Sequence, residues 1–344
     1  IMVAMGRGAR AGVLARDAEA LETLERVDTL VVDKTGTLTE GRPVLSRVLP
    51  MGGASEEEAL RLAASLEVGS AHPIARAISQ SARERGLTPA EATEFKSLDG
   101  LGVSGAIDGH VTFLGGASLM AERGIGIDHL RDMAEKSSAA GGTVIYLARD
   151  TELLALLVVT DPIKESSREA VPLLKQAGIE IIMATGDGAG TAQAVGLELG
   201  VERIHAAILP QAKAALVDDL KAAGKVVAMA GDGINDAPAL ALADVGIAMG
   251  DGSDIAVESA GLTLVKGDLR GIVRARNLSV ATMRNIRQNL GFAFVYNILG
   301  VPLAAGILFP WFGLLLSPIF ASLAMSLSSV SVITNALRLR RARL

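Results

Sequence analysis

One short loop carries the residues with the clearest chemistry. Residues 33–39 read Asp-Lys-Thr-Gly-Thr-Leu-Thr and follow an apolar, β-branched run at residues 27–32. Such a run predicts a buried parallel strand, so Asp33 is expected at its carboxyl end, where open α/β sheets bind ligands. The small and hydroxylated residues after Lys34 let phosphate oxygens approach the backbone. A carboxylate placed there can act as a covalent nucleophile and form an aspartyl phosphate.

Two further motifs offer groups that can hold a phosphoryl oxygen. Thr185, Gly186 and Asp187 follow a strand-like run at residues 180–184. A threonine hydroxyl and a glycine N–H suit that role, although such a turn by itself is more often a helix N-cap. Lys213, on an expected helix, can neutralise the charge of the transferring group, although most such lysines are exposed helix residues.

The loop Gly-Asp-Gly-Ile-Asn-Asp at residues 231–236 offers hard oxygen ligands. Asp232, supported by Asn235 and Asp236, suits Mg²⁺ together with water and substrate phosphate. Asp33 and Asp232 can share one ion, with Thr35 beside them, which offsets the repulsion between the carboxylate and the phosphate. A calcium loop is longer and ends in Glu, and that pattern is absent.

Composition excludes several classes of protein. The 344 residues are enough for two or three domains, and the net charge of −5 gives no sign of a nucleic-acid surface. With no cysteine, disulfides and thiolate metal sites are excluded. Half of the residues are hydrophobic and the mean hydropathy is +0.40, which is high for a wholly soluble protein. Because the chain opens at Ile1 rather than Met, we expect it to be incomplete at its N-terminus.

The C-terminal region predicts a membrane hairpin. Residues 289–337 contain no Asp, Glu, Lys, Arg or His, and an aromatic break at residues 309–313 divides them. The two segments, about 288–309 and 314–337, are each near the ~20 residues that cross a bilayer. Arginines bracket the pair and form a basic tail, so both ends are expected to face the cytosol. A buried helical hairpin in a soluble domain would rarely need so long an uncharged run.

Upstream of the hairpin, strand-like runs alternate with helical stretches. The runs at residues 180–184, 225–230, 245–249 and 262–265 predict an α/β fold with a doubly wound parallel sheet. Residues 45–157 lack this rhythm and read as helices followed by hairpins, one of them turning at Asp108-Gly109. We therefore predict an inserted α+β domain. The expected domains are 1–44 and 158–280 for the sheet, 45–157 for the insertion and 281–344 for the hairpin and tail.

In this order the motifs resemble the haloacid dehalogenase fold, and DKTGTLT narrows the resemblance to P-type ATPases. Hydrolases of that superfamily usually carry a second Asp two residues after the nucleophile, as the general acid/base. Here the position is Thr35, which implies a long-lived aspartyl phosphate. Residues 161–164, Asp-Pro-Ile-Lys, match a family element near the hinge. The resemblance gives Asp33, Lys34 and Thr35 catalytic roles, together with Thr185, Gly186, Asp187 and Lys213.

The inserted domain resembles the nucleotide-binding domain of heavy-metal ATPases. Residues 70–73 (Ser-Ala-His-Pro) match the family's Ser-x-His-Pro, and Glu67 precedes them at the family spacing. The resemblance implies that His72 and Glu67 contact the adenine of ATP, and that Gly100 and Gly102 admit the nucleotide. On physical grounds alone, His72 before Pro73 would cap a helix. Two positions depart from the family pattern: Ala71, where many relatives have Glu, and Gly116, where Asn is usual.

The hairpin carries the information on the transported ion. Tyr296 and Asn297 lie in the first segment, while Met325, Ser328 and Ser329 share one helical face in the second. They resemble the Tyr-Asn and Met-x-x-Ser-Ser patterns of copper(I)-transporting ATPases. Thioether suits a soft ion, and the absence of ionisable residues argues against zinc, calcium or protons. Polar residues that only join helices fit the sequence equally well. The resemblance favours Cu(I), with Ag(I) second.

Whole pumps of this kind also have an intramembrane Cys-Pro-Cys, further membrane helices and an actuator domain with Thr-Gly-Glu. None of these occurs in residues 1–344, so the resemblance implies a missing N-terminal half as partner. It further implies a multi-pass protein of the plasma or bacterial inner membrane, with cytosolic catalytic domains, ATP, and Cu(I) from a copper chaperone. A membrane-anchored phosphatase and a non-transporting nucleotide-binding remnant are the alternatives.

Overall fold

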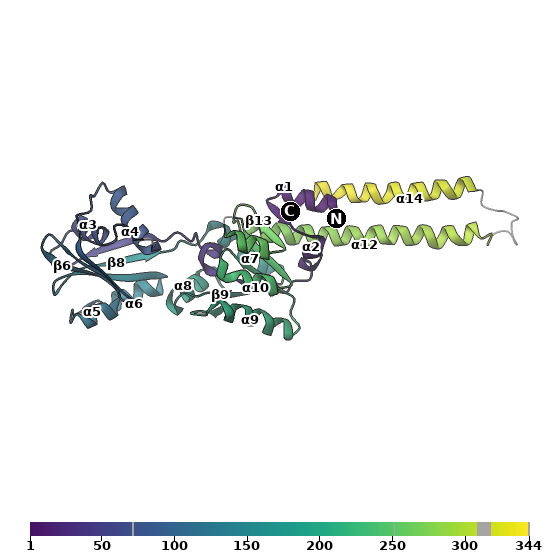
Figure 1. Cartoon of the computed structure of the whole chain (residues 1–344). Helices are drawn as coiled ribbons and strands as arrows, with labels where there is room; N and C mark the ends of the chain where they lie inside the picture. The colour runs from purple at the N-terminus through teal and green to yellow at the C-terminus, as the bar shows by residue number, and fades with distance from the viewer. Residues whose placement is uncertain (71, 251, 308–317, 343–344) are drawn as a thin grey trace. The chain divides into compact units, whose positions relative to one another are not determined.

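The computed structural model describes residues 1–70, 72–250, 252–307 and 318–342 (Figure 1). Two sheets with their helices, and a pair of long helices, make up this part of the chain. The predicted turn at residues 309–313 and Ala71 lie outside it.

The larger sheet has seven strands in the order β1-β13-β12-β11-β2-β9-β10. β11, β12 and β13 are parallel, as are β9 and β10, while β1 runs antiparallel to β13 at one edge. Every residue of β2, β11 and β12 is buried, as expected of central strands covered on both faces. The strands are β1 Val13–Ala15, β2 Thr29–Val32, β9 Glu180–Ala184, β10 Arg203–His205, β11 Val227–Gly231, β12 Val245–Met249 and β13 Leu262–Leu264. The predicted parallel α/β sheet is confirmed.

Short helices with local caps connect these strands. Asp17 caps the first of them, because its carboxylate accepts a hydrogen bond of 2.8 Å from the backbone N–H of Ala20. Ser253 caps another in the same way through the N–H of Ala256. The helices are α2 Ala18–Leu24, α7 Glu165–Gln176, α8 Ala189–Leu199, α9 Pro210–Ala222, the turn η3 Ile234–Asp236, α10 Ala237–Leu242 and α11 Asp254–Ser259.

The smaller sheet is antiparallel throughout, with six strands in the order β3-β8-β7-β6-β5-β4. The strands are β3 Val44–Pro50, β4 Thr93–Leu98, β5 Gly102–Ile107, β6 His110–Gly115, β7 Gly142–Arg149 and β8 Glu152–Thr160. Its helices are α3 Glu56–Leu66, α4 Pro73–Glu84, α5 Ala117–Glu122, η2 Asp128–Leu130 and α6 Arg131–Ala139. Ile107 pairs with His110 across the predicted Asp108-Gly109 turn, and both turn residues have positive φ, so this hairpin is confirmed.

Two hydrophobic cores line the smaller sheet. The first packs α3 and α4 against the sheet through residues such as Leu60, Ile78 and Leu147. The second contains Leu119 and Met120 of α5, packed against residues that include Leu156 of the sheet. With apolar cores of its own, this sheet can hold its side chains in place independently of the larger one.

A pair of long helices follows the larger sheet in the chain. α12 runs from Arg270 to Ala304 and lies beside α14, Pro318–Arg338; the short helices α1, Met2–Arg10, and η4, Leu339–Arg341, lie near their ends (Figure 1). α12 is continuous through residue 281, where the sequence predicted the start of a separate segment. In the part of the chain that the structure describes, no helix is both long enough and apolar enough to cross a bilayer. Residues 308–317 of the two predicted spans lie outside that part.

The first half of α12 is attached to α2. The guanidinium of Arg276 donates to the backbone oxygens of Leu24, at 3.3 Å, and Val27, at 2.7 Å. Further along, Arg287 makes a two-pronged ion pair with Glu25, at 3.1 and 2.9 Å. The bond to Leu24 satisfies the last carbonyl of α2, and the contacts together fix α12 to the segment that precedes β2.

Candidate active site

The loop after β2 has a fixed, sharply turned backbone. Asp33 leaves the strand in an extended conformation, and Gly36 adopts φ +72°, a conformation that glycine takes without strain. The N–H of Thr39 closes the turn by donating to the Lys34 carbonyl at 3.0 Å. Asp33 is 6% exposed, whereas Thr35 points to solvent. The loop therefore holds the candidate nucleophile in a nearly buried position.

Residues 161–167 fasten this loop from the side. Asp161 accepts a hydrogen bond of 2.5 Å from the Thr39 hydroxyl. The buried Lys164 ammonium donates to the Gly36 carbonyl at 2.5 Å, and the Ser167 hydroxyl donates to the Leu38 carbonyl at 2.9 Å. The sequence had marked residues 161–164 only as an element near the hinge, and Ser167 was missed, because nothing in its spacing distinguishes it from a surface helix residue.

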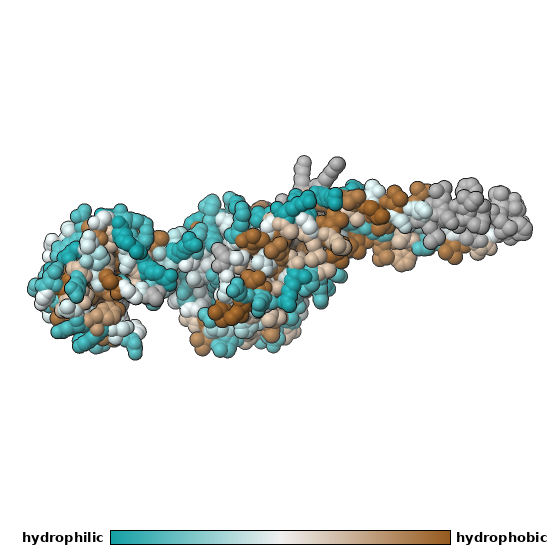
Figure 2. All heavy atoms as spheres, turned by 45° about the horizontal axis from the view of Figure 1, so that its top comes forward, coloured by the Kyte–Doolittle hydropathy of each residue, from teal (hydrophilic) through white to brown (hydrophobic). Residues whose placement is uncertain are grey.

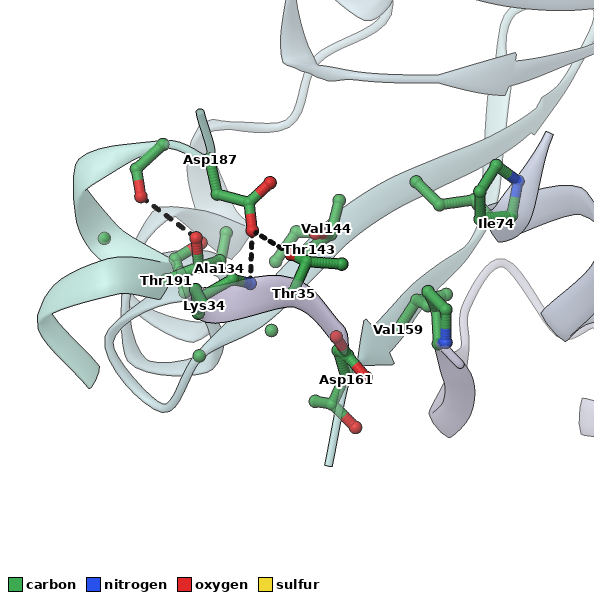
Figure 3. A pocket seen from close by; sticks show the side chains of 18 of the residues that line it. Lys34, Thr35, Ile74, Ala134, Thr143, Val144, Val159, Asp161, Asp187 and Thr191 are labelled. Carbon is green, nitrogen blue, oxygen red and sulfur yellow. Dashed lines mark hydrogen bonds and ion pairs between the residues drawn. The ribbon is translucent and has the colours of Figure 1, made fainter. Parts of the chain in front are cut away.

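Asp187 contacts the same loop through its carboxylate. One oxygen forms an ion pair with the Lys34 ammonium and accepts a hydrogen bond of 3.1 Å from the Thr35 hydroxyl (Figure 3). The Thr185 hydroxyl accepts from the N–H of Asp187 at 3.1 Å, which leaves its own proton available to donate. The structure therefore brings the loop and the Thr-Gly-Asp turn together through Asp187.

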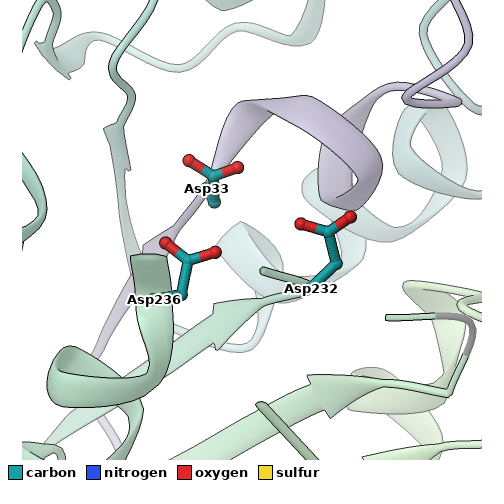
Figure 4. A group of neighbouring side chains, drawn as sticks. All are labelled: Asp33, Asp232 and Asp236. Carbon is teal, nitrogen blue, oxygen red and sulfur yellow. The ribbon is translucent and has the colours of Figure 1, made fainter. Parts of the chain in front are cut away.

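Three carboxylates lie close together. Asp33, Asp232 and Asp236 each offer an oxygen within 4.8 Å of the others (Figure 4). Asp236 is paired with Lys213 at 2.7 Å, with side chains 3% and 6% exposed. Lys213 thus neutralises this carboxylate, whereas the sequence assigned it to the phosphoryl group. Asn235, expected in support, is exposed. Hard oxygen donors gathered in this way fit a Mg²⁺ ion.

A cavity of about 780 Å³ adjoins the loop. Lys34, Thr35 and Asp187 line it together with His72 and residues of β7 and α6. Of the four residues expected to bind nucleotide, only His72 lines this cavity.

A comparison with known protein families assigns the fold. The family model described as haloacid dehalogenase-like hydrolase matches residues 27–244. The chain belongs to this family.

Similar proteins include metal-transporting P-type ATPases. The chain is 56% identical to a copper-transporting P-type ATPase of Rhizobium leguminosarum bv. viciae and 54% identical to a silver-exporting P-type ATPase of Salmonella typhimurium. All 344 residues align in both cases, and they cover 41% and 42% of those relatives. A zinc-transporting PIB-type ATPase in the E2·Pi state superimposes with a TM-score of 0.87 at 34% identity, over 99% of this chain and 54% of that one. The resemblance to heavy-metal P-type ATPases is confirmed, and the chain spans less than half of the curated relatives' length.

A His-Pro turn caps α4, one of the helices of the smaller sheet. The His72 ring accepts a hydrogen bond of 3.3 Å from the N–H of Ile74 through Nδ1, and Pro73 occupies the first turn of α4. Because Nδ1 accepts, the proton of the neutral ring is on Nε2. The capping role that physical grounds predicted is thus present, and it leaves Nε2–H as a donor for a ligand.

The two glycines of the Gly-x-Gly have different surroundings. A Cβ on Gly102, at φ +144°, would lie 2.2 Å from the Leu114 carbonyl oxygen, whereas one on Gly100, at φ +71°, would meet no atom within 4 Å. Gly102→Ala is therefore expected to lower the free energy of unfolding by about 2–5 kcal/mol, and Gly100→Ala by about 1–2 kcal/mol. Urea denaturation of the two variants checks this. Equal losses would contradict the close approach of β5 and β6 at Gly102.

Glu67, at the end of α3, has a perturbed carboxyl. Burial raises its pKa, while a hydrogen bond with Ser70, and the charge of His72 when its ring is protonated, lower it in part. The folded state therefore holds this proton more tightly than the unfolded chain, so stability falls as pH rises from the ordinary carboxyl pKa of about 4.3 to the raised value. We expect Glu67→Gln to gain stability relative to the wild type across this window. Denaturation at pH 4 and pH 7 measures it, with the exposed Glu57→Gln as control; a constant difference would be the contrary result.

The residues expected to bind copper lie on the two long helices. Tyr296 and Asn297 are exposed on α12, and the Asn297 amide donates to the Ala293 carbonyl of its own helix at 2.8 Å. Ser328 and Ser329 lie on α14, and the side chain of Met325 is outside the described part of the chain.

Proposed function

We propose that this chain is the catalytic portion of an ATP-driven copper(I) exporter and that it transfers the γ-phosphate of ATP to Asp33. One observation carries the proposal: a nearly buried carboxylate, held by a braced loop, lies within 4.8 Å of two further carboxylates. Thr35 stands where a hydrolase of this family would hold its general base, which favours a phosphoenzyme over rapid hydrolysis.

The proposed step is an in-line displacement. A carboxylate oxygen of Asp33 forms a bond to the γ-phosphorus as the bond to the bridging oxygen of ADP breaks, and ADP leaves with that electron pair. The Thr185 hydroxyl, whose oxygen already accepts from the N–H of Asp187, would donate its proton to a phosphoryl oxygen. Lys34 and Thr35, tied to Asp187, keep the loop in place during the displacement.

Mg²⁺ is the cation that these side chains fit. Asp33 and Asp232 would hold it, with Thr35, Asn235 and Asp236 in support. When bound, the ion offsets the repulsion between the attacking carboxylate and the anionic phosphate. Asp236, already neutralised by Lys213, adds little negative charge to the site.

ATP is proposed to bind on the smaller sheet. Nε2–H of His72 is a donor suited to a ring nitrogen of adenine, and Glu67, kept in a partly buried position, is suited to its amino group. Gly100, with open space where a Cβ would stand, lets the nucleotide approach the backbone. Gly102, two residues later, lets β5 and β6 approach closely.

The hairpin of α12 and α14 is proposed to lie in a membrane. Apolar side chains such as Leu290, Phe294 and Ile298 are exposed along α12 (Figure 2), and residues 289–337 carry no charge. Burial in lipid would account for such a surface, because soluble proteins rarely leave it uncovered. The cytosolic side would hold the catalytic domains.

Copper(I) is the proposed cargo, with silver(I) as a second ion. The methionine, serine, tyrosine and asparagine of the hairpin are neutral, which suits a soft monovalent ion and not zinc. The side chains proposed to contact the ion are Tyr296, Asn297, Met325, Ser328 and Ser329. The rest of the pump, with its actuator domain, and a copper chaperone are the proposed partners.

Labelling with γ-labelled ATP tests the proposal. The full chain with Mg²⁺ should acquire acid-stable label that hydroxylamine removes, since an acyl phosphate is cleaved by that reagent, and ADP should chase it back to ATP. Cu(I) added with the missing half of the pump should raise the labelling rate. Steady release of phosphate from a phosphomonoester without label accumulation would instead favour a phosphatase, and failure to label at any Mg²⁺ concentration would favour a nucleotide-binding remnant.

A further inference from the structure

A small basic cavity lies where α1 meets η4. It has a volume of about 270 Å³ and is lined by Met2, Val3, Gly6, Arg7, Arg10 and Arg340. Three arginines therefore line one space, and the described residues of this lining include no carboxylate. Since the chain as a whole has a net charge of −5, this cluster is a local concentration of positive charge and not a general property of the surface.

Arg7 lines this cavity and makes a hydrogen bond beside it. One terminal nitrogen donates to the carbonyl of Ala342 at 3.2 Å, which ties α1 to the segment after α14. Its Nε is buried and has no hydrogen-bond partner among the residues that the structure describes. The guanidinium carries further N–H donors in a planar fork, and that geometry suits an anion with several oxygens.

A neighbouring cavity also contains basic side chains, but an acidic side chain is present among them. Arg10 also lines a space shared with Lys266, Arg274 and Asp268. There Asp268 binds Arg274 at 3.2 Å, so an acidic side chain balances the local positive charge. Among the residues that the structure describes, the lining of the cavity at Arg7 contains no such acid, so an external anion would balance its charge.

Apolar groups stand beside these arginines. Met2 is 88% exposed, and Val3 lines the same cavity. Arg340 follows the uncharged run that ends at Leu337, in the turn η4 directly after α14. An apolar rim next to clustered guanidiniums, at the end of a hydrophobic hairpin, is the chemistry of the boundary between acyl chains and headgroups.

We propose that this cavity binds the phosphate of an anionic phospholipid headgroup, with Arg7, Arg10 and Arg340 as its ligands and Met2 against the acyl chains. The inference rests on the proposed membrane hairpin. Bound lipid would join α1 to the end of α14, because the three arginines come from both ends of the chain. A soluble phosphate would also satisfy the guanidiniums, but Arg340 directly follows the uncharged run that the hairpin proposal places in the membrane, so the lipid is the better occupant.

Native mass spectrometry of the full chain, released from a neutral detergent, tests the site. The wild type titrated with phosphatidylglycerol is expected to bind it about tenfold or more tightly than phosphatidylcholine. Arg340→Gln, at an exposed position, and Arg7→Gln should each weaken phosphatidylglycerol binding about fivefold, the effect of roughly one basic residue at an anionic surface. Arg131→Gln, exposed on α6, removes the same charge elsewhere and should have no effect.

Three results would overturn the inference: equal binding of the two lipids by the wild type, equal weakening by Arg131→Gln, or displacement of the lipid by an equal concentration of glycerol 1-phosphate. Arg340→Gln alone decides the matter if Arg7→Gln does not fold. Flotation with phosphatidylcholine vesicles separates this from the hairpin proposal. A chain that fails to float contradicts the hairpin, whereas one that floats without headgroup preference contradicts only the lipid site.

Discussion

Asp33→Asn is expected to abolish acid-stable labelling by ATP, reducing it by roughly 10⁴-fold or more. An amide does not displace ADP from the γ-phosphorus, and no other described carboxylate stands in the same position at the end of β2. The measurement is the label retained after acid quench, with and without hydroxylamine. Undiminished labelling of Asp33→Asn would place the phosphoryl group elsewhere and refute the proposed nucleophile.

The same substitution should also change the response to Mg²⁺. Asp33, Asp232 and Asp236 lie close enough to repel one another, so replacing one of them by a neutral amide should raise the melting temperature without metal. Added Mg²⁺ should stabilise the wild type by binding the folded state, and Asp33→Asn much less. Thermal unfolding at increasing Mg²⁺ measures both. This readout is independent of ATP, so it checks the cation site even if labelling is slow.

Asp161→Asn is the matched control for this charge change. Asp161 braces the loop through Thr39 and the N–H of Arg42 but is not the nucleophile. An amide oxygen can still accept one of these bonds, so labelling should persist at a rate lowered by about tenfold, a modest cost for misplacing a reacting group. Complete loss of label in this variant would mean that the brace, and not Asp33 alone, limits the chemistry.

The elements that carry the strongest residue patterns were predictable from the sequence. The buried runs that became β2, β9, β11 and β12 are continuous and apolar, which is how a strand covered on both faces must read. The turn at Asp108-Gly109 needs two residues at positive φ, and few other dipeptides meet that need. Such local requirements restrict the residue types at these positions, so they can be recognised in the sequence.

Features that depend on tertiary contacts could not be predicted from residue types in this way. β4 is almost wholly exposed and therefore lacks the alternation that reveals a strand. Lys164 and Ser167 donate to backbone carbonyls of a loop more than 120 residues away. Because every residue has a backbone carbonyl, no residue type in the loop indicates this contact. α12 starts at Arg270, and its residues Arg276 and Arg287 bind the segment around Glu25, so the arginines that precede the apolar run belong to the same helix.

The ion pair of Lys213 and Asp236 supports the second large prediction. Lys213→Met is expected to lower the free energy of unfolding by about 3–5 kcal/mol, because it leaves the carboxylate of Asp236 buried without its cation. It should also suppress labelling, since an unneutralised Asp236 adds negative charge beside Asp33. Urea denaturation and acid-stable labelling measure the two effects.

Two further variants distinguish the effect of leaving Asp236 without its cation from the effect of removing a lysine from α9. Lys221→Met, on the same helix α9, removes a partly exposed pair with Asp244 and should cost less than about 1 kcal/mol. Adding Asp236→Asn to Lys213→Met removes the orphaned charge and should restore much of the stability. If the double variant is no more stable than Lys213→Met, the lysine contributes through packing alone. If stability returns but labelling does not, Lys213 or Asp236 acts in phosphoryl transfer beyond neutralising the other, which is how the sequence alone had assigned them.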